Sequence, residues 1–193
     1  FSIGIISSLI ALSRLDLVLF ISPLHGFLII RMLLQKKIKE VLALALPPIL
    51  IVGGYVALIY IITGSPVPLS GVIKSNFPYI NKEIVLSSLL TLQIKYGILA
   101  TSITLTCAVG CAFLSKFIKK KNILFKIKSY LNIIWLLLIG AFLHVLYHIL
   151  FTKIGSVGRW YFVVHLNASI LSISLFLYYL KIFFEKNFFY KFI

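Results

Sequence analysis

Four long apolar runs constrain the fold of this chain more than any other feature of its sequence. They cover residues 41–62, 97–118, 131–151 and 160–182, and each has 21 to 23 residues. At about 1.5 Å per residue, a helix of that length crosses the roughly 30 Å hydrocarbon core of a bilayer. Because lipid requires backbone polar groups to be paired within their own segment, these runs predict membrane-spanning helices.

Two shorter apolar runs, 1–13 and 15–30, share the polar break Ser13-Arg14-Leu15-Asp16. They fit either one long span with a charged joint or two short helices that meet near one membrane face. We therefore expect an all-α, polytopic transmembrane bundle of five to six membrane segments. The chain forms a single transmembrane domain, 1–193. Since it starts inside an apolar run, we expect it to be the C-terminal part of a longer membrane protein.

The distribution of basic residues predicts the orientation. The net charge is +15, and thirteen of the nineteen Lys and Arg residues lie in or beside 31–40, 116–129 and 181–191. The other six lie in the alternate segments. Cytoplasmic loops are enriched in Lys and Arg, so loops 31–40 and 119–129 are predicted to be cytoplasmic, and loops 63–82 and 152–159 extracytoplasmic. In a chain this apolar, basic loops indicate contact with membrane lipid, and no nucleic-acid partner is expected.

Cysteine labelling tests this orientation. Cysteines placed at Ser70 and Ser156 are expected to react with a membrane-impermeant reagent added outside, because both positions lie in predicted extracytoplasmic loops. A cysteine placed at Asn122 is expected not to react. Labelling of Asn122→Cys together with protection of the other two would reverse the orientation.

Residues 83–96 join the outer loop to the next span. Four polar residues recur there at three- and four-residue spacing, on one face of a helix: Ser87, Ser88, Thr91 and Lys95. This pattern fits an amphipathic helix at the outer interface. The alternative is that the segment extends the span that follows.

Three outer segments carry the candidate binding residues. Arg14 and Asp16 are ionisable residues flanked by apolar sequence, which is costly in lipid and favours a functional site over a self-neutralising pair. Loop 63–74 contains two prolines and two glycines, which shape its backbone, and ends at Lys74. Segment 155–161 has two glycines before Arg159, a bidentate phosphate donor, although its aromatic residues also suit an interfacial belt.

Histidines are the remaining candidates. His144 and His148 lie four residues apart on one predicted helical face. Two histidines supply only part of a metal site, so we expect a polar face inside the bundle, no metal site and no cofactor, while a divalent metal stays open for a full-length protein. His25 and His165 receive no role. The two cysteines are expected to pack as small apolar residues.

Several of these segments resemble bacterial GT-C glycosyltransferases. Residues 12–16 (LSRLD) are similar to the "LxR-P/L-D/E" element of that superfamily. Residues 46–48 (LPP) lead into 64–71 (GSPVPLSG) and Lys74, which resembles its "YGSPLPxSGxxK" stretch, and 158–161 (GRWY) resembles its "RYY/RWY" segment.

The resemblance implies an enzyme of the bacterial inner (plasma) membrane. Such an enzyme moves a sugar from a polyprenyl-phosphate carrier to a glycan, lipid or protein acceptor outside the cytoplasm. The lipid-phosphate candidates are Arg14, Lys74 and Arg159. The supporting candidates are Asp16, Ser70, Trp160, Tyr161 and His148. The catalytic carboxylate of the family lies in an early outer loop with no counterpart here, so no catalytic residue is assigned.

Two other classes stay open. A transporter or lipid flippase could carry the break at 13–16 in a discontinuous helix, but it should show a second broken helix related by internal symmetry, and no such repeat is found. A non-catalytic membrane assembly subunit would use the outer motifs only for packing. An acidic early outer loop upstream would favour the transferase.

Overall fold

A computed structural model describes residues 2–65, 74–80, 82–117, 121–153 and 159–189, and for some helical residues among them the backbone alone. Predicted site residue Ser70 and labelling position Ser156 lie outside the described residues. Across the described ranges the chain is helical, with one isolated β-bridge between Ser75 and Thr152. The all-α expectation is therefore confirmed.

The helices follow one another through short connections. In chain order they are α1 (Ser2–Ser13), α2 (Leu17–Leu34), α3 (Ile38–Thr63), α5 (Lys82–Leu90), α6 (Leu92–Ser115), α7 (Lys121–Phe151), the 3-10 helix η1 (Arg159–Phe162) and α8 (Val163–Phe189). Five of the described helices, α2, α3, α6, α7 and α8, contain stretches long and apolar enough to cross a membrane. The polytopic membrane bundle predicted from the apolar runs is confirmed.

Several helices reach further than the apolar runs suggested. α7 begins at Lys121, so most of predicted loop 119–129 is helical. In predicted loop 31–40, α2 continues to Leu34 and α3 begins at Ile38. Hydropathy marks only the part of a helix that lipid surrounds, whereas Lys, Arg and Leu are good helix formers that carry the helix on into water.

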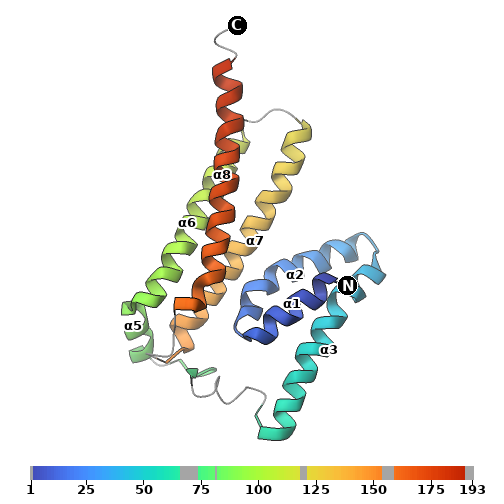
Figure 1. The fold of residues 1–193 in the computed structure, drawn as a ribbon, viewed down its shortest axis with the longest axis vertical. Coiled ribbons are helices and arrows are strands. Elements are labelled where there is room, and N and C mark those ends of the chain that lie inside the picture. The colour runs from blue at the N-terminus through green and yellow to red at the C-terminus, as the bar shows by residue number, and fades with distance from the viewer. Residues whose placement is uncertain (1, 66–73, 81, 118–120, 154–158, 190–193) are drawn as a thin grey trace.

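The break at residues 13–16 separates two helices. α1 and α2 lie side by side and meet at this joint, as Figure 1 shows in its lower part. The two apolar runs therefore form two helices that meet at the break and not one long span with a charged joint. Further along, α5 is a separate nine-residue helix that ends before Thr91, whose backbone is extended, and residues 92–96 form the first turns of α6. The first part of segment 83–96 is thus a separate helix, and its last residues extend the following span, so each of the two alternatives holds for part of the segment.

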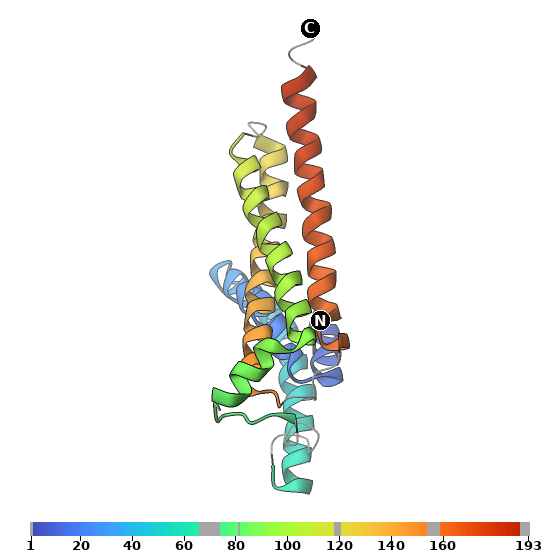
Figure 2. The same cartoon turned by 90° about the vertical axis from the view of Figure 1, so that its left-hand side faces the viewer.

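The helices form two groups. α6, α7 and α8 pack side by side along their lengths, and the C-terminal end of α8 extends beyond the other two (Figures 1 and 2). α1, α2 and α3 form a second group beside α7 (Figure 1). The groups meet where α2 crosses α7. At this crossing a side chain on Gly140 would collide with the backbone carbonyl of Phe20, so only glycine allows the two helices this approach. Phe20 then packs on Ala141 of α7 and Ala168 of α8.

The connections lie at different heights along the molecule. The joint at 13–16, the end of α3 and the start of α8 lie towards the lower end in Figure 1, and the end of α6 and the start of α7 lie at the upper end. The connection between α2 and α3 lies at mid-height, beside the long bundle. Which loops face the cytoplasm stays a prediction.

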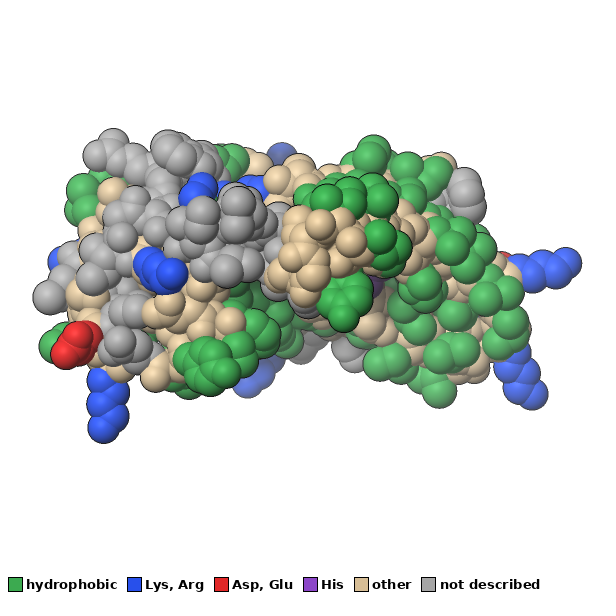
Figure 3. Space-filling model, turned by 90° about the horizontal axis from the view of Figure 1, so that it is seen from below, with side chains coloured by type: hydrophobic (Ala, Val, Ile, Leu, Met, Phe, Trp, Pro, Cys, Tyr) green, Lys and Arg blue, Asp and Glu red, His purple; other side chains and the backbone are tan. Residues whose placement is uncertain are grey.

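Exposed apolar side chains cover the outside of the bundle, as a lipid-facing surface requires. Ile61, Leu34 and Ile62 are among the most exposed, at 79%, 82% and 70%. Viewed from below in Figure 3, apolar side chains cover much of the surface, and Lys and Arg side chains project from its rim. Cys107 and Cys111 are free and buried, as expected of packing residues.

Candidate functional site

A charged pair occupies the joint between α1 and α2. Arg14 Nε donates a hydrogen bond to Asp16 Oδ1 at 3.1 Å, and Arg14 Nη2 donates to Asp16 Oδ2. Two parallel N–H···O contacts of this kind form the bidentate arrangement that orients a carboxylate firmly. The pair is partly buried, with 23% of the Arg14 side chain and 14% of the Asp16 side chain exposed.

Two histidines of α7 meet the same carboxylate. His144 Nε2 lies 3.1 Å from Asp16 Oδ2, and His148 Nε2 lies 3.0 Å from that oxygen. Both histidines are fully or almost fully buried. Their spacing of four residues places both rings on one face of α7, with centroids 4.6 Å apart. Asp16 therefore joins the two groups of helices through polar contacts.

The surroundings of Asp16 favour its ionised form. Burial raises the pKa of a carboxyl group, but here the contacts of its oxygens with His144, His148 and Arg14, together with the charge of Arg14, outweigh burial. The pKa of Asp16 consequently lies far below its ordinary value.

A second layer of hydrogen bonds holds the histidine rings. His144 Nδ1 lies 2.9 Å from His165 Nε2, and His165 Nδ1 lies 3.1 Å from the hydroxyl oxygen of Thr101. His148 Nδ1 lies 2.8 Å from the hydroxyl oxygen of Thr152. These contacts bring α6, α7 and α8 into one network and fix which ring edge each histidine of α7 turns towards Asp16.

Aromatic rings line one side of this network. The Arg14 guanidinium lies over the Tyr161 ring, with its central carbon 3.3 Å from the ring centroid, a cation–π contact. Phe162 is buried and stacks edge-on against His144, His148 and His165, with centroids 5.3 to 6.2 Å away. It fits there because Gly97 of α6 has no side chain, and a Cβ would overlap the Phe162 ring.

The segment that follows loop 63–73 is fastened to the end of α7. The Lys153 N–H donates to the Lys74 carbonyl at 2.9 Å, and the Asn76 N–H donates to the Phe151 carbonyl at 2.7 Å. Tyr147 also donates its hydroxyl proton to Ser75 at 3.1 Å. Since these contacts flank Thr152, the segment supports the residue that holds His148.

The structure brings together four of the predicted site residues: Arg14, Asp16, Tyr161 and His148. Lys74 lies on the segment fastened beside them, with an exposed side chain. Arg159 and Trp160 begin η1, directly before Tyr161, and their side chains lie outside the described part of the chain.

Four members of the hydrogen-bond network had no predicted site role: His144, His165, Thr101 and Thr152. The sequence indicated only that His144 shares a helical face with His148. Asp16 is the only aspartate in the chain, and this could have suggested it as the carboxylate that contacts the two histidines. His165 and Thr101 carried no signal in the sequence, because nothing local indicates that α6 and α8 turn them towards α7.

The cluster contains a set of atoms that could hold a metal ion. One carboxylate oxygen of Asp16 and one ring nitrogen each of His144 and His148 lie within 4.8 Å of one another. The expectation of no metal site was based on two histidines supplying only part of a site, with just Asp16 and Glu83 as carboxylates on the predicted outer side. The joint between α1 and α2 supplies a third ligand.

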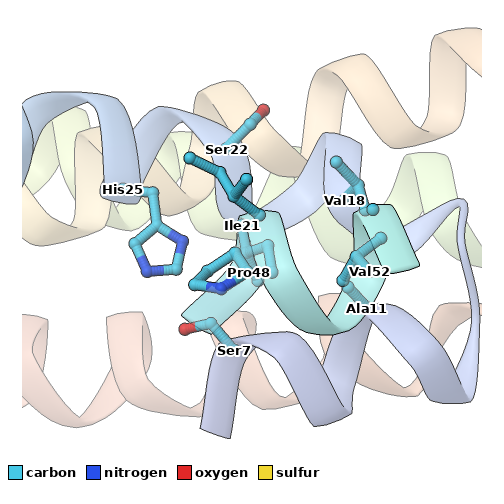
Figure 4. Close-up of a pocket in the computed structure, with 10 residues that line it drawn as sticks. Ser7, Ala11, Val18, Ile21, Ser22, His25, Pro48 and Val52 are labelled. Atoms are coloured by element: carbon cyan, nitrogen blue, oxygen red, sulfur yellow. The ribbon is translucent and has the colours of Figure 1, made fainter. Parts of the chain in front are cut away.

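A groove opens between α1, α2 and α3, beside the joint. Its volume is about 320 Å³, and its lining includes Ala11, Val18, Val52 and Pro48, with Ser7, Ser22 and His25 as polar groups (Figure 4). Within the described part of the chain, the buried Nε2 of His25 has no hydrogen-bond partner. The groove is mainly apolar, and Ala11 and Val18 flank the charged joint in sequence.

Comparison with protein-family models, curated proteins and solved structures gave no match to this chain.

Proposed function

We propose that the protein is a membrane glycosyltransferase that takes a sugar from a polyprenyl-phosphate carrier and passes it to an extracytoplasmic acceptor. The observation that carries the proposal is a convergence of three segments. The joint at 14–16, segment 74–76 and the start of η1–α8 are far apart in sequence and meet at one end of the bundle. Of the residues that carry the resemblance to GT-C enzymes, the joint, Lys74 and residues 159–161 lie in these segments, while most of loop 64–71 lies outside the described residues.

The chemistry of a lipid-phosphate donor suits this end. When the sugar leaves, the phosphate gains negative charge, and cations fixed beside it stabilise the transition state. Arg14 is fixed by Asp16 and Tyr161, and within the described residues its Nη1 makes no hydrogen bond, so donors remain for an anion. Lys74 is exposed on the adjoining segment and forms no ion pair with a described residue.

The groove between α1, α2 and α3 suits the carrier's hydrocarbon chain. It begins next to the joint and is lined mainly by apolar side chains. An isoprenoid segment lying there would keep its phosphate beside Arg14. The groove therefore adds a reason to place a lipid-linked substrate at this end of the bundle.

The proposal is tested by a transfer assay with the full-length protein. Purified protein in lipid vesicles is given radiolabelled polyprenyl-phosphate sugars together with a membrane extract as the source of acceptors. Lys74→Ala and Arg159→Ala are each expected to lower kcat about 100- to 1,000-fold, the usual effect of losing one group that stabilises transition-state charge. The measurement is sugar incorporated per unit time at saturating donor.

Lys82→Ala is the matched control, because Lys82 is an exposed lysine at the start of α5. It should keep wild-type turnover, and size-exclusion profiles should be unchanged for all three variants. Full turnover in both Lys74→Ala and Arg159→Ala would exclude these residues from the phosphate site. Movement of the carrier between leaflets without sugar transfer would instead establish a flippase.

A further inference from the structure

The geometry points to a binding site for one divalent transition-metal ion, of the Zn²⁺ class, formed by Asp16, His144 and His148. Two imidazole nitrogens and one carboxylate oxygen are ligands that such ions prefer, and three protein ligands leave at least one position open. The Asp16 oxygen lies 3.1 and 3.0 Å from the two nitrogens. Ligands about 2.1 Å from a tetrahedral ion stand roughly 3.4 Å apart, which is close to these two distances, and the three ligand atoms all lie within 4.8 Å of one another.

The hydrogen bonds behind His144 determine which of its nitrogens carries a proton. Thr101 has one hydroxyl proton, which it donates to the Gly97 carbonyl at 2.8 Å. Its oxygen therefore accepts from His165, whose Nδ1 carries the proton. A neutral His165 then accepts at Nε2, and the donor 2.9 Å away is His144 Nδ1–H.

This chain of donors leaves a lone pair on His144 Nε2. That lone pair faces Asp16 Oδ2 at 3.1 Å, and a carboxylate oxygen offers only further lone pairs. Two acceptors in contact repel each other, so a cation must lie between them. Either a second proton on His144 or a metal ion satisfies both groups.

His148 also has an outer partner. Its Nδ1 contacts the Thr152 hydroxyl, and its Nε2 meets the same Asp16 oxygen as His144 does. Each histidine thus has one nitrogen held by an outer partner and the other aimed at one shared point. Metal-binding histidines show this arrangement, in which the outer partner fixes the ring and its tautomer.

A metal ion rather than a proton also accounts for the position of the site beside an anion-binding surface. Without a metal, Arg14 and Asp16 cancel each other's charge. With a divalent ion the group carries about two positive charges near a joint that is partly open to solvent. The open coordination position then favours an anionic oxygen, and phosphate is the fitting class. This last step rests on the proposed function, whereas metal binding itself does not.

Metal titration of the chelator-treated full-length protein tests the inference. Isothermal titration with Zn²⁺ is expected to show one ion per chain and a higher melting temperature, while Mg²⁺ at the same concentration produces neither effect. Co²⁺ should give the visible absorption of an ion bound by nitrogen and oxygen ligands. Absence of stoichiometric Zn²⁺ binding would overturn the site and leave a doubly protonated His144 as the cation.

Variants locate the ion. Asp16→Asn and His148→Ala are expected to weaken Zn²⁺ binding at least 100-fold, and Thr152→Val, which keeps the shape of the side chain, about 10- to 100-fold. Ser174→Ala, an exposed position of α8 outside the cluster, should bind like wild type. If all four retain wild-type affinity, the bound Zn²⁺ is adventitious. If Asp16→Asn or His148→Ala misfolds, the Zn²⁺ affinity of Thr152→Val and the Co²⁺ spectrum of the wild type still show whether the ion binds at this cluster.

Failure of metal binding and failure of glycosyl transfer are separate outcomes. Zn²⁺ binding is measured without a sugar donor, and sugar transfer is measured with and without added Zn²⁺. If the protein binds one Zn²⁺ but transfers no sugar, the metal site is supported and the proposed function is contradicted. If sugar transfer is unchanged after complete removal of metal, the proposed function is supported and the metal has no part in binding the phosphate.

Discussion

Asp16→Ala is expected to lower the free energy of unfolding by about 3 kcal/mol, because removing one partner of a buried charge pair leaves the other uncompensated. Arg14 would lose both hydrogen bonds to the carboxylate, and His144 and His148 would lose the oxygen they share. No described side chain besides Asp16 offers these groups a carboxylate. The contact between α2 and α7 would then rest on apolar packing alone.

Unfolding in mixed detergent micelles, followed by circular dichroism, measures this loss. Glu40→Ala is the matched control, since Glu40 is an exposed carboxylate in the first turn of α3 and its removal should change stability by less than about 1 kcal/mol. Equal effects of the two substitutions would show that the joint contributes no more than a surface charge. Such a result would contradict the network described around Asp16.

Gly140→Ala is expected to be the other strongly destabilising change, by about 3 kcal/mol, since its methyl group would overlap the Phe20 carbonyl. A backbone carbonyl cannot turn aside as a flexible side chain can, so α2 must shift away from α7. That shift would also separate Asp16 from the two histidines. The substitution therefore connects helix packing to the geometry of the candidate site.

Gly26→Ala is the control for helix propensity. Gly26 lies inside α2, and a side chain there would meet no neighbour within 4 Å. Alanine should stabilise that helix by about 0.5–1 kcal/mol. Thermal unfolding of the two variants should thus move in opposite directions, and in Gly140→Ala Zn²⁺ binding should weaken together with stability. A wild-type melting temperature for Gly140→Ala would show that α2 does not approach α7 as closely as described.

These experiments separate two roles of the same residues. Asp16 joins the N-terminal helices to α7, and it also presents one oxygen to two histidines. Unfolding reports the first role, while metal binding and sugar transfer report the second. Asp16→Asn is informative here because it keeps the size of the side chain and removes its charge.

Part of the candidate site could be predicted from sequence. Arg14 and Asp16 interrupt an apolar stretch, and ionisable groups at membrane depth are rare enough to stand out. The four-residue spacing of His144 and His148 places both on one helical face. What could not be predicted was that the joint and this face meet, because Asp16 and His148 are 132 residues apart.

Sequence alone determined the class of this protein and the approximate place of each membrane segment. Those properties depend on local composition, since hydrocarbon selects apolar helices of a fixed minimum length. Tertiary structure decided the rest. Closely packed glycine contacts set where α2 crosses α7 and where Phe162 fits against α6. Such crossings depend on side-chain shape across distant helices, and they turned an isolated Arg–Asp pair and a histidine pair into one polar cluster.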